Sequence, residues 1–585
     1  QFFVWCQGAL QLCQLLVSSY LRSCISSLEL RFALPSATSG LLTSFNEVGN
    51  TLLIVLVSYL GSRWHRPRLI GTGALLGALA ALLMALPHFM AGPYQYDQSV
   101  PSSPCAHVPA GTFSNATDLC QPEVPGAWGN LSGTACPAQA ARQDQELLLV
   151  MFLAQALLGI GAVPIQPFGI SYIDDFASQR NSPLYLAPSS EVPRLEVSTL
   201  GLGTQLRALP QLCPLCPPER VQLRRQDPRW VGAWWLGFLL AASLLALAAL
   251  PYFFFPREMP TEVGEALQSL LGAVRGHQGF PRVLLRTLCQ PLFLPVVLAQ
   301  ASLGAMVSGL ATFMGKFLER QFSVTASQAN VAMGAVNIPG AMVGILLGGA
   351  ILKRFRLSLR QCSALCLLGT FLCLLLTFPL LFLGCPTQKV AGITYSHSGA
   401  GGRQPLACSG HCGCPEEGFN PICGSNQLEF SSPCAAGCSV ATASLGTSPG
   451  TSPGTHTLSY SNCSCIPGDG TARPGTCGTS CSHLFLPFVA LSCLAGIFAS
   501  TSHTPSCVLL LRSCQPQDKS LAVGIQFMLL RVLAWMPAPV LYGSAIDSCC
   551  LLWQRRCARR AACRYYDNDL FRQRYLGLQL LFEAG

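Results

Sequence analysis

Long apolar runs recur along the whole chain and restrict it to folds that use a lipid bilayer as solvent. A run of about 20 apolar residues crosses the hydrocarbon core of a bilayer as a helix. Ten runs have this length, and an eleventh begins at Tyr575 and reaches the last residue. The ten predicted spans are Phe2–Leu21, Leu41–Leu60, Leu69–Ala91, Glu146–Tyr172, Val231–Phe255, Pro291–Phe317, Asn330–Leu352, Gln361–Gly384, Leu484–Leu511 and Leu521–Tyr542. The sequence therefore predicts an all-α polytopic membrane protein.

The composition supports this class and argues against several others. Charged residues make up 11 % of the chain and hydrophobic residues 50 %, whereas soluble proteins carry about 25 % charged residues. The net charge of +10 lies mostly in loops, which indicates membrane topology rather than nucleic-acid binding. The sequence contains no nucleotide-binding loop, metal motif or nucleophile elbow. We therefore expect no enzyme, cofactor, bound metal or ATP-driven pump. The chain begins at Gln1 inside its first apolar run, which suggests a fragment.

Two short basic connections look like the same loop used twice. Gly61–Gly71 and Gly348–Ser358 each combine glycine with three or more cations between apolar runs. Short basic loops favour the cytoplasm, and a repeated one suggests two related halves, as in many transporters. Chance is the alternative, because every polytopic protein has basic cytoplasmic loops. The cations expected in these cytoplasmic gating loops include Arg63, Arg66, Arg68, Lys353 and Arg354.

Ten of the 30 cysteines form a cluster in a Gly/Ser/Pro-rich stretch. An even number of closely spaced cysteines in such a stretch predicts a disulfide scaffold on the extracellular side, here of five disulfides. Zinc is the weaker alternative, because only His411 lies among them. The cysteines are Cys408, Cys412, Cys414, Cys423, Cys434, Cys438, Cys463, Cys465, Cys477 and Cys481.

Three glycosylation acceptors place two loops outside the cell. Asn115 and Asn130 share the loop Gly92–Gln145, and Asn462 lies inside the cysteine cluster. Five predicted spans separate these loops, yet an odd number would put them on opposite sides. The missing crossing falls at residues 186–225, whose prolines and charges do not allow a stable spanning helix. Either the topology inverts there, or this stretch replaces a normal helix through splicing or an erroneous gene model.

One long motif identifies the family. The residues "DPRWVGAWWLGF" (Asp227–Phe238) resemble the signature that opens the sixth transmembrane helix of the organic anion transporting polypeptides. "CPEEGFNPICGSNQLEFSSPCAAGC" (Cys414–Cys438) is similar to the Kazal-type extracellular domain of that family, and "VPIQPFGISYIDDF" (Val163–Phe176) agrees. "RVLAWMPAPVLYG" and "YYDNDLFRQRYLGLQ" resemble its prostaglandin-transporting branch.

The resemblance implies a fold and a domain plan. It implies a major-facilitator-like fold of 12 helices in two six-helix halves, here incomplete, with a small Kazal-like domain outside a multi-pass plasma-membrane protein. The predicted parts are an N-terminal half (1–255, with 186–225 aberrant where the family has its fifth helix), a cytoplasmic linker (256–290), a C-terminal half in two pieces (291–384 and 483–585) and the Kazal-like domain (385–482).

Three ionisable residues within apolar runs are candidates for the transport site. Arg531 lies midway along its span, where burial of charge is costly, and a guanidinium binds a carboxylate with two hydrogen bonds. We expect it to bind substrate, with an internal salt bridge as the alternative. Glu47 would repel an anion, so a proton-linked or gating role is expected. His88 titrates near neutrality. The resemblance implies that Glu47 and His88 belong to a pH- or bicarbonate-linked site.

The leading hypothesis is sodium-independent exchange of amphipathic organic anions, prostanoids above all, for a counter-anion such as bicarbonate or lactate. A second hypothesis is a membrane-tethered Kazal-type protein that binds proteases or acts as a scaffold. A third is an inactive isoform, because one helix is replaced. Uptake of labelled prostaglandin separates the first from the other two.

Overall fold

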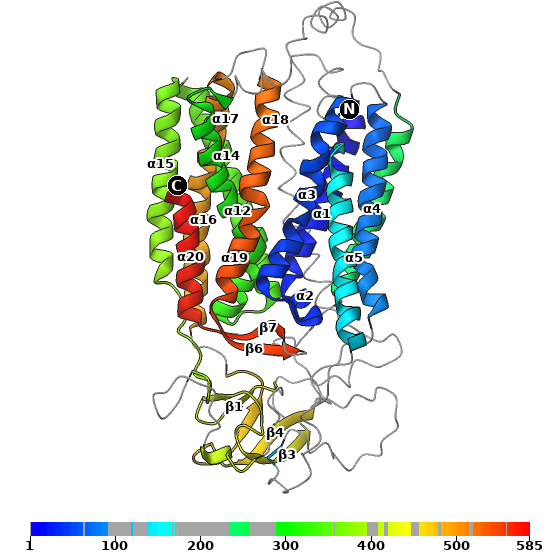
Figure 1. Ribbon diagram of the computed structural model, residues 1–585. Helices are drawn as coiled ribbons and strands as arrows, with labels where there is room; N and C mark the ends of the chain where they lie inside the picture. Colours follow the sequence, from blue (N-terminus) through cyan, green and yellow to red (C-terminus); the bar gives the residue numbers. More distant parts are fainter. Residues whose placement is uncertain are drawn as a thin grey trace, which may run out of the picture.

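The protein was analysed as a computed structural model, shown in Figure 1, and part of the chain is described. The described residues are 2–61, 65–91, 119–120, 138–165, 168–169, 172, 231, 233–256, 288–355, 357–394, 407–412, 414, 419–445, 456–477, 481–513, 519–556 and 559–584. They form two groups of long helices with a small β-rich domain at one end of the bundle.

The helices of the N-terminal half are α1 (Phe2–Ser23), α2 (Ile25–Phe32), α3 (Ser36–Gly61), α4 (Arg66–Met90), α5 (Ala138–Ala162) and α9 (Trp234–Ala249), which continues as the 3-10 turn η3 (Leu250–Phe253). Those of the C-terminal half are α12 (Phe293–Phe322), α13 (Ala326–Ala332), α14 (Ile338–Phe355), α15 (Leu359–Thr377), α16 (Phe485–Thr501), α17 (His503–Ser513), α18 (Lys519–Leu530), α19 (Pro537–Asp547) and α20 (Asn568–Ala584). Eight helices of the described chain are long and apolar enough to span a membrane. The polytopic all-α prediction for the bundle is confirmed.

Each half has its own apolar core. Trp234 and Phe238 of α9 are fully buried with residues of α1, α4 and α5 in the first half. Phe313 and Phe317 of α12 have the same role in the second half, where Phe317 stacks on Tyr575 with ring centroids 4.8 Å apart. Many large apolar side chains on the outside of the helices remain exposed. This distribution is the one that a lipid-facing surface requires.

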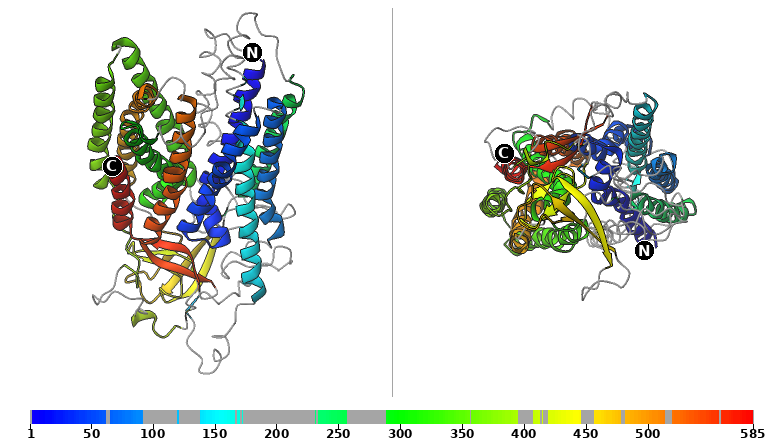
Figure 2. Two further views of the ribbon diagram at one scale, coloured as in Figure 1. Left: turned by 45° about the horizontal axis from the view of Figure 1, so that its top comes forward. Right: turned by 90° about the horizontal axis from the view of Figure 1, so that it is seen from below.

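The two halves meet at the end of the bundle that adjoins the β-rich domain. Helices α3 and α19 cross there with their backbones in close contact, because a Cβ at Gly40 would overlap the carbonyl oxygen of Pro539, and a Cβ at Gly543 would overlap that of Ser36. Small residues allow such approach between membrane helices. Toward the other end the two groups of helices diverge (Figure 2).

The β-rich domain holds a five-stranded antiparallel sheet in the order β2-β1-β5-β4-β3. Its strands are β1 (Ile422–Gly424), β2 (Glu429–Phe430), β3 (Cys438–Leu445), β4 (His456–Cys463) and β5 (Ala472–Pro474). Short strands around a very small core explain why this domain depends on disulfides rather than on burial of apolar surface.

A β-hairpin lies between this domain and the helices. Strands β6 (Cys550–Arg556) and β7 (Arg559–Tyr566) pair antiparallel, and a disulfide joins Cys550 to Cys563. The sequence analysis did not predict this hairpin. It also missed α2, whose Ile25 packs into the core of the C-terminal half.

Tyr172 and Trp234, which lie on either side of one long connection, are at opposite ends of the N-terminal half. Tyr172 contacts Phe3 at the start of α1, with ring centroids 4.5 Å apart, and its hydroxyl donates to the carbonyl of Pro256. Trp234, by contrast, contacts Phe32 at the end of α2. The predicted aberrant segment 186–225 falls outside the described residues, and its nature stays a prediction.

Candidate functional site

Arg531 and Glu47, two residues that the sequence analysis singled out separately, lie together where the halves face each other. Arg531 Nε lies 3.7 Å from Glu47 Oε2, and the two side chains are 18 % and 21 % exposed. Glu47 belongs to α3 and Arg531 to the C-terminal half, so the pair bridges the two halves. A helix rises about 1.5 Å per residue, which places Glu47 roughly 16 Å along α3 from its first residue and near the middle of that helix.

The local backbone around Arg531 departs from an ordinary α-helix. Residues Arg531–Trp535 form a π-helical turn, η8, between α18 and α19. Such turns are frequent at functional sites because they leave part of the backbone ladder unpaired. The Nη1 atom of Arg531 is buried without a hydrogen-bond partner. The guanidinium therefore retains a donor that an anion could use, since its contact with Glu47 is made through Nε.

A second ion pair between the halves was missed by the sequence analysis. Lys316 of α12 donates to Glu29 Oε2 at 2.5 Å and to Ser36 Oγ at 2.7 Å, and Ser39 Oγ donates to Glu29 Oε1 at 2.6 Å. The side chains of Lys316 and Glu29 are only 3 % and 6 % exposed. Lys316 lies inside a predicted span and could have been noted as an intramembrane charge, but Glu29 lay between two predicted spans.

Asp547 adds a third polar contact between the halves. Its two carboxylate oxygens accept hydrogen bonds from the backbone N–H groups of Ser36 and Ala37, at 2.9 and 2.8 Å. These are among the first N–H groups of α3, which have no partner within the helix. A carboxylate at a helix N-terminus also interacts favourably with the helix dipole. The last residue of α19 thus caps the first turn of α3 across the interface.

His88 lies within the N-terminal half, near the end of α4. Its ring stacks on that of Trp235 with centroids 4.8 Å apart and lies edge-on to Phe89. Arg31 is a charged group that interacts with the imidazole electrostatically. His88 therefore contacts aromatic residues of the N-terminal half, whereas Glu47 and Arg531 contact each other across the two halves.

The predicted basic loops lie at the end of the bundle opposite the β-rich domain. Arg66 and Arg68 fall in the first turn of α4, and Lys353 and Arg354 in the last turn of α14. Arg63 lies outside the described residues. Because α4 and α15 both lead back toward the β-rich domain, these cations share the far side of the bundle, and their gating role stays a prediction.

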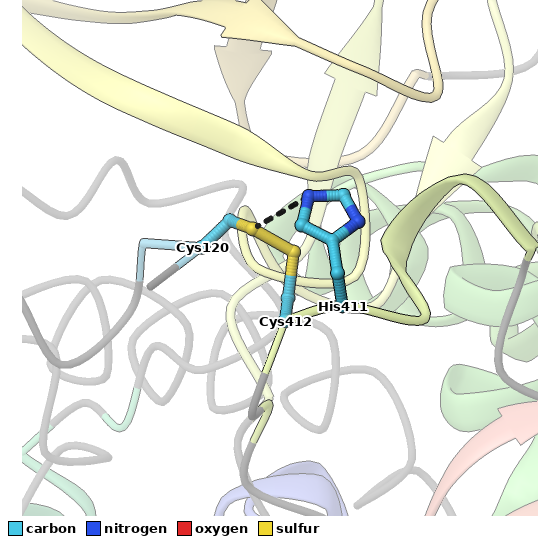
Figure 3. Close-up of side chains that lie close together, drawn as sticks. All are labelled: Cys120, His411 and Cys412. Carbon is cyan, nitrogen blue, oxygen red and sulfur yellow. Dashed lines mark hydrogen bonds between the residues drawn. A yellow bond between two sulfur atoms is a disulfide. The ribbon is translucent and has the colours of Figure 1, made fainter. Parts of the chain in front are cut away.

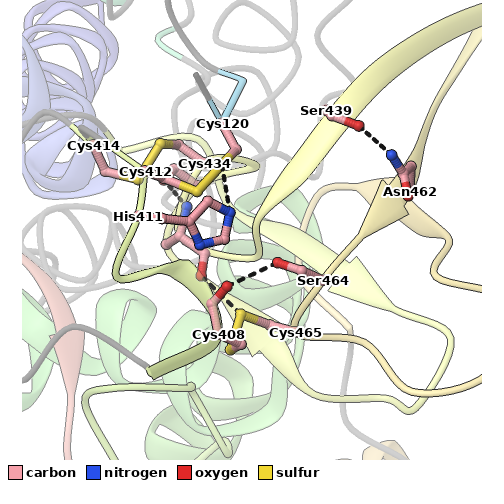
Figure 4. The surroundings of a disulfide bond; sticks show 12 residues. Cys120, Cys408, His411, Cys412, Cys414, Cys434, Ser439, Asn462, Ser464 and Cys465 are labelled. Atoms are coloured by element: carbon pink, nitrogen blue, oxygen red, sulfur yellow. Dashed lines mark hydrogen bonds between the residues drawn. A yellow bond between two sulfur atoms is a disulfide. The ribbon is translucent and has the colours of Figure 1, made fainter. Parts of the chain in front are cut away.

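All ten cluster cysteines are disulfide-bonded, but the prediction of five disulfides within the cluster is wrong. Two of the ten pair outside it: Cys412 with Cys120, which lies between α4 and α5 (Figure 4), and Cys481 with Cys385. Spacing along the chain could not show that distant segments meet. The six pairs are Cys120–Cys412, Cys385–Cys481, Cys408–Cys465, Cys414–Cys434, Cys423–Cys477 and Cys438–Cys463.

One predicted glycosylation acceptor is described. Asn462 is exposed on β4, and its Nδ2 donates to Ser439 Oγ at 2.6 Å. Asn115 and Asn130 lie outside the described residues. Glycosylation at all three positions stays a prediction.

A buried carboxyl joins the β-rich domain to the hairpin. The Tyr565 hydroxyl donates to Glu429 Oε1, and the backbone N–H of Cys477 donates to Oε2 at 3.4 Å. Burial raises the pKa of Glu429. Tyr565 also packs against Phe419, with ring centroids 5.4 Å apart. These contacts hold the β-rich domain on the extracellular end of the C-terminal half.

Comparison with known sequences decides the family. The Organic Anion Transporter Polypeptide (OATP) family matches residues 2–571. The chain belongs to the OATP family. It is 48 % identical to solute carrier organic anion transporter family member 2B1 of Rattus norvegicus, over 100 % of this chain and 89 % of the relative. It is 47 % identical to member 2B1 of Homo sapiens, over 100 % of this chain and 86 % of the relative, and 32 % identical to human member 1B3, over 95 % and 82 %.

Comparison with solved structures shows that this OATP chain shares its fold with known transporters. A bacterial homolog of the human lysosomal transporter Spinster, in an inward-facing and unoccupied conformation, superposes with a TM-score of 0.55 at 12 % identity, over 94 % of this chain and 82 % of that one. A mutant of the nucleoside transporter NupG gives 0.52 at 10 % identity, over 100 % and 98 %. At such low sequence identity, the structural similarity shows only that the fold is shared. This OATP chain is a multi-pass membrane protein of the cell membrane with a transporter fold.

Proposed function

We propose that this OATP chain carries amphipathic organic anions, with prostanoids as the substrate class, and that Arg531 binds the substrate carboxylate. The observation that carries the proposal is the buried Nη1 of Arg531, which has no hydrogen-bond partner although the residue lies where the two halves meet. A guanidinium binds a carboxylate with two parallel hydrogen bonds. Arg531 contacts Glu47 only through Nε and at 3.7 Å, so its other nitrogens remain able to bind a carboxylate in this way.

Transport would proceed by alternating access of the two halves. Contacts at the extracellular end, including Lys316–Glu29 and the Asp547 cap, close that side, while the halves diverge toward the basic loops. Arg531 and Glu47 lie between these two regions. A substrate that enters between the halves would replace Glu47 as the partner of Arg531, and the freed carboxylate could then take a proton.

The same proposal assigns Glu47 and His88 to the coupling step. Exchange would then be independent of sodium, with bicarbonate or lactate as the counter-anion. A titrating imidazole and a carboxylate released from its cation are two groups through which pH or bicarbonate could act on the cycle.

The test is uptake of labelled prostaglandin in cells that express the protein. Arg531→Ala should reduce uptake at least ~10-fold with surface protein unchanged, because a charge-assisted pair contributes more than about 1.4 kcal/mol. Arg531→Lys should restore part of the rate, since an ammonium keeps the charge but lacks the planar fork. Full uptake by the alanine variant would exclude Arg531 as the anion site, and absence of prostaglandin uptake by the parent would exclude the substrate class.

A further inference from the structure

Within the described residues, one disulfide links the extracellular loop of the N-terminal half to the β-rich domain of the C-terminal half. Cys120 lies between α4 and α5, and Cys412 lies in the β-rich domain, 292 residues further along the chain. Two weaker contacts accompany the bond. The backbone N–H of Cys120 donates to the carbonyl of Cys438 at 2.9 Å, and Leu119 packs against the core of the β-rich domain.

A histidine lies directly beside this disulfide. The Nε2 atom of His411 is 3.6 Å from Cys120 Sγ, and the three side chains place their reactive atoms within 4.8 Å of one another (Figure 3). His411 is exposed, Cys120 is partly exposed and Cys412 is buried. The bond is therefore reachable from solvent on its Cys120 side. Both sulfurs are consumed in the disulfide, so neither is a thiolate that could bind a metal.

Histidine is one of the side chains that affect thiol exchange at a neighbouring disulfide. A protonated imidazole stabilises a neighbouring thiolate, and a better-stabilised leaving thiolate leaves faster. Access decides which sulfur is attacked. The Cys408–Cys465 disulfide of the same domain provides the contrast, because the neighbour of its residues in Figure 4 is Ser464, whose hydroxyl donates to the carbonyl of Cys408 at 2.9 Å.

We propose that Cys120–Cys412 is a thiol–disulfide exchange site for extracellular dithiols, with His411 as the residue that activates it. One thiolate of the dithiol attacks Cys120 Sγ, the Sγ–Sγ bond breaks, and Cys412, whose sulfur lies within 4.8 Å of a ring nitrogen of His411, leaves as a thiolate that takes a proton. The second thiol of the reagent then attacks the reagent's own sulfur in the mixed disulfide and releases Cys120 as a thiolate beside His411. The Cys120 thiolate then also takes a proton. The protein gains two electrons and two protons, and the dithiol becomes a cyclic disulfide.

The consequence for the molecule is loss of its covalent connection between the N-terminal half and the β-rich domain at this point. The remaining hydrogen bond and the Leu119 contact are much weaker than a covalent bond. Reduction would therefore let the extracellular ends of the two halves separate more easily, while the other disulfides preserve the β-rich domain.

The experiment measures the reduction of individual disulfides in the full-length protein at the cell surface. Cells are treated with a membrane-impermeant dithiol in the presence of a chelator, new thiols are alkylated, and mass spectrometry quantifies each pair over time. Cys120 and Cys412 should become alkylated at least ten times faster than Cys408 and Cys465. His411→Gln should slow only the first pair, whereas Ser464→Ala should change neither.

The outcomes are decisive in both directions. Equal reduction rates for the two disulfides, or a His411→Gln variant with an unchanged rate, would overturn the proposal. If His411→Gln reaches the surface poorly, the comparison of the two disulfides within the parent protein still decides. The readout is thiol chemistry, so it does not depend on whether the protein carries prostanoids.

Discussion

The two ion pairs that join the halves differ in almost every physical respect. Lys316 and Glu29 are nearly inaccessible, contact at 2.5 Å and share three short hydrogen bonds with each other and with two serines. Arg531 and Glu47 are about one-fifth exposed, contact at 3.7 Å and leave a buried guanidinium nitrogen without a partner.

This difference separates a structural contact from a binding site. A buried pair repays its desolvation cost only with good geometry and further hydrogen bonds, and Lys316–Glu29 has both. Arg531–Glu47 has neither, so its opening costs less and an anion can compete for the cation. The sequence indicated Arg531 and Glu47 as charges within apolar runs, but it could not show that Lys316 and Glu29 form a closed pair.

Removal of one partner of the closed pair should have the largest effect. Lys316→Ala leaves Glu29 buried and uncompensated, which costs about 3–5 kcal/mol. We expect a marked loss of folded protein, measured by surface biotinylation and by the melting temperature of purified protein. The double variant Lys316→Ala/Glu29→Ala should recover part of this loss, because no isolated charge remains.

Arg531→Ala is the matched control for that prediction. It should leave surface amount and melting temperature near the parent values, because the loose pair stabilises little. If Lys316→Ala were as stable as Arg531→Ala, the distinction between the two pairs would be wrong.

The Asp547 cap should have an intermediate effect. Asp547→Ala leaves the first N–H groups of α3 without their acceptors, and loss of an N-terminal cap costs about 0.5–2 kcal/mol. Asp547→Asn should cost less, since one oxygen remains. Denaturation of the purified variants measures the difference, with exposed Ser548→Ala as control. Unchanged stability of the alanine variant would show that the cap contributes nothing to closure of the extracellular end.

The smallest effect concerns the contact between the β-rich domain and the hairpin. Burial raises the pKa of the Glu429 carboxyl above its ordinary value of 4.5. A group whose pKa is raised on folding stabilises the fold fully below about pH 4.5, and this stabilisation is lost as the pH rises through the raised pKa. We therefore expect the melting temperature to fall over that range by a small amount that depends on Glu429.

Glu429→Gln should remove that component, because the amide stays neutral at every pH. Equal pH dependence in the parent and the glutamine variant would show that Glu429 does not couple this contact to pH.

The sequence predicted the helical bundle well because apolar length and hydrophobicity decide a membrane span almost by themselves. Each of the ten predicted spans coincides with described helix, although Glu146–Tyr172 was placed too far along the chain relative to α5, which ends at Ala162. The hairpin and the sheet were missed, since their strands carry no strong alternation of apolar and polar residues. The pattern of apolar runs could not identify the transporter family, which was identified from the signature at Asp227–Phe238.

The candidate site was predicted in part. Arg531 and Glu47 were each found as costly charges within apolar runs, and the structure shows that they meet. Lys316–Glu29, the Asp547 cap and the Cys120–Cys412 disulfide join residues that are hundreds of positions apart. Contacts at such separation depend on how the two halves dock, which no local pattern in the sequence encodes.

The central claim is that Glu47 and the substrate carboxylate compete for Arg531. The most direct test is equilibrium binding of labelled prostaglandin to purified parent, Glu47→Gln, Arg531→Ala and the double variant. We predict tighter binding by Glu47→Gln, at least ~10-fold weaker binding by Arg531→Ala, and binding by the double variant as weak as that of Arg531→Ala. Equal loss of binding in both single variants, with recovery in the double variant, would show instead that Arg531–Glu47 only holds the helices together.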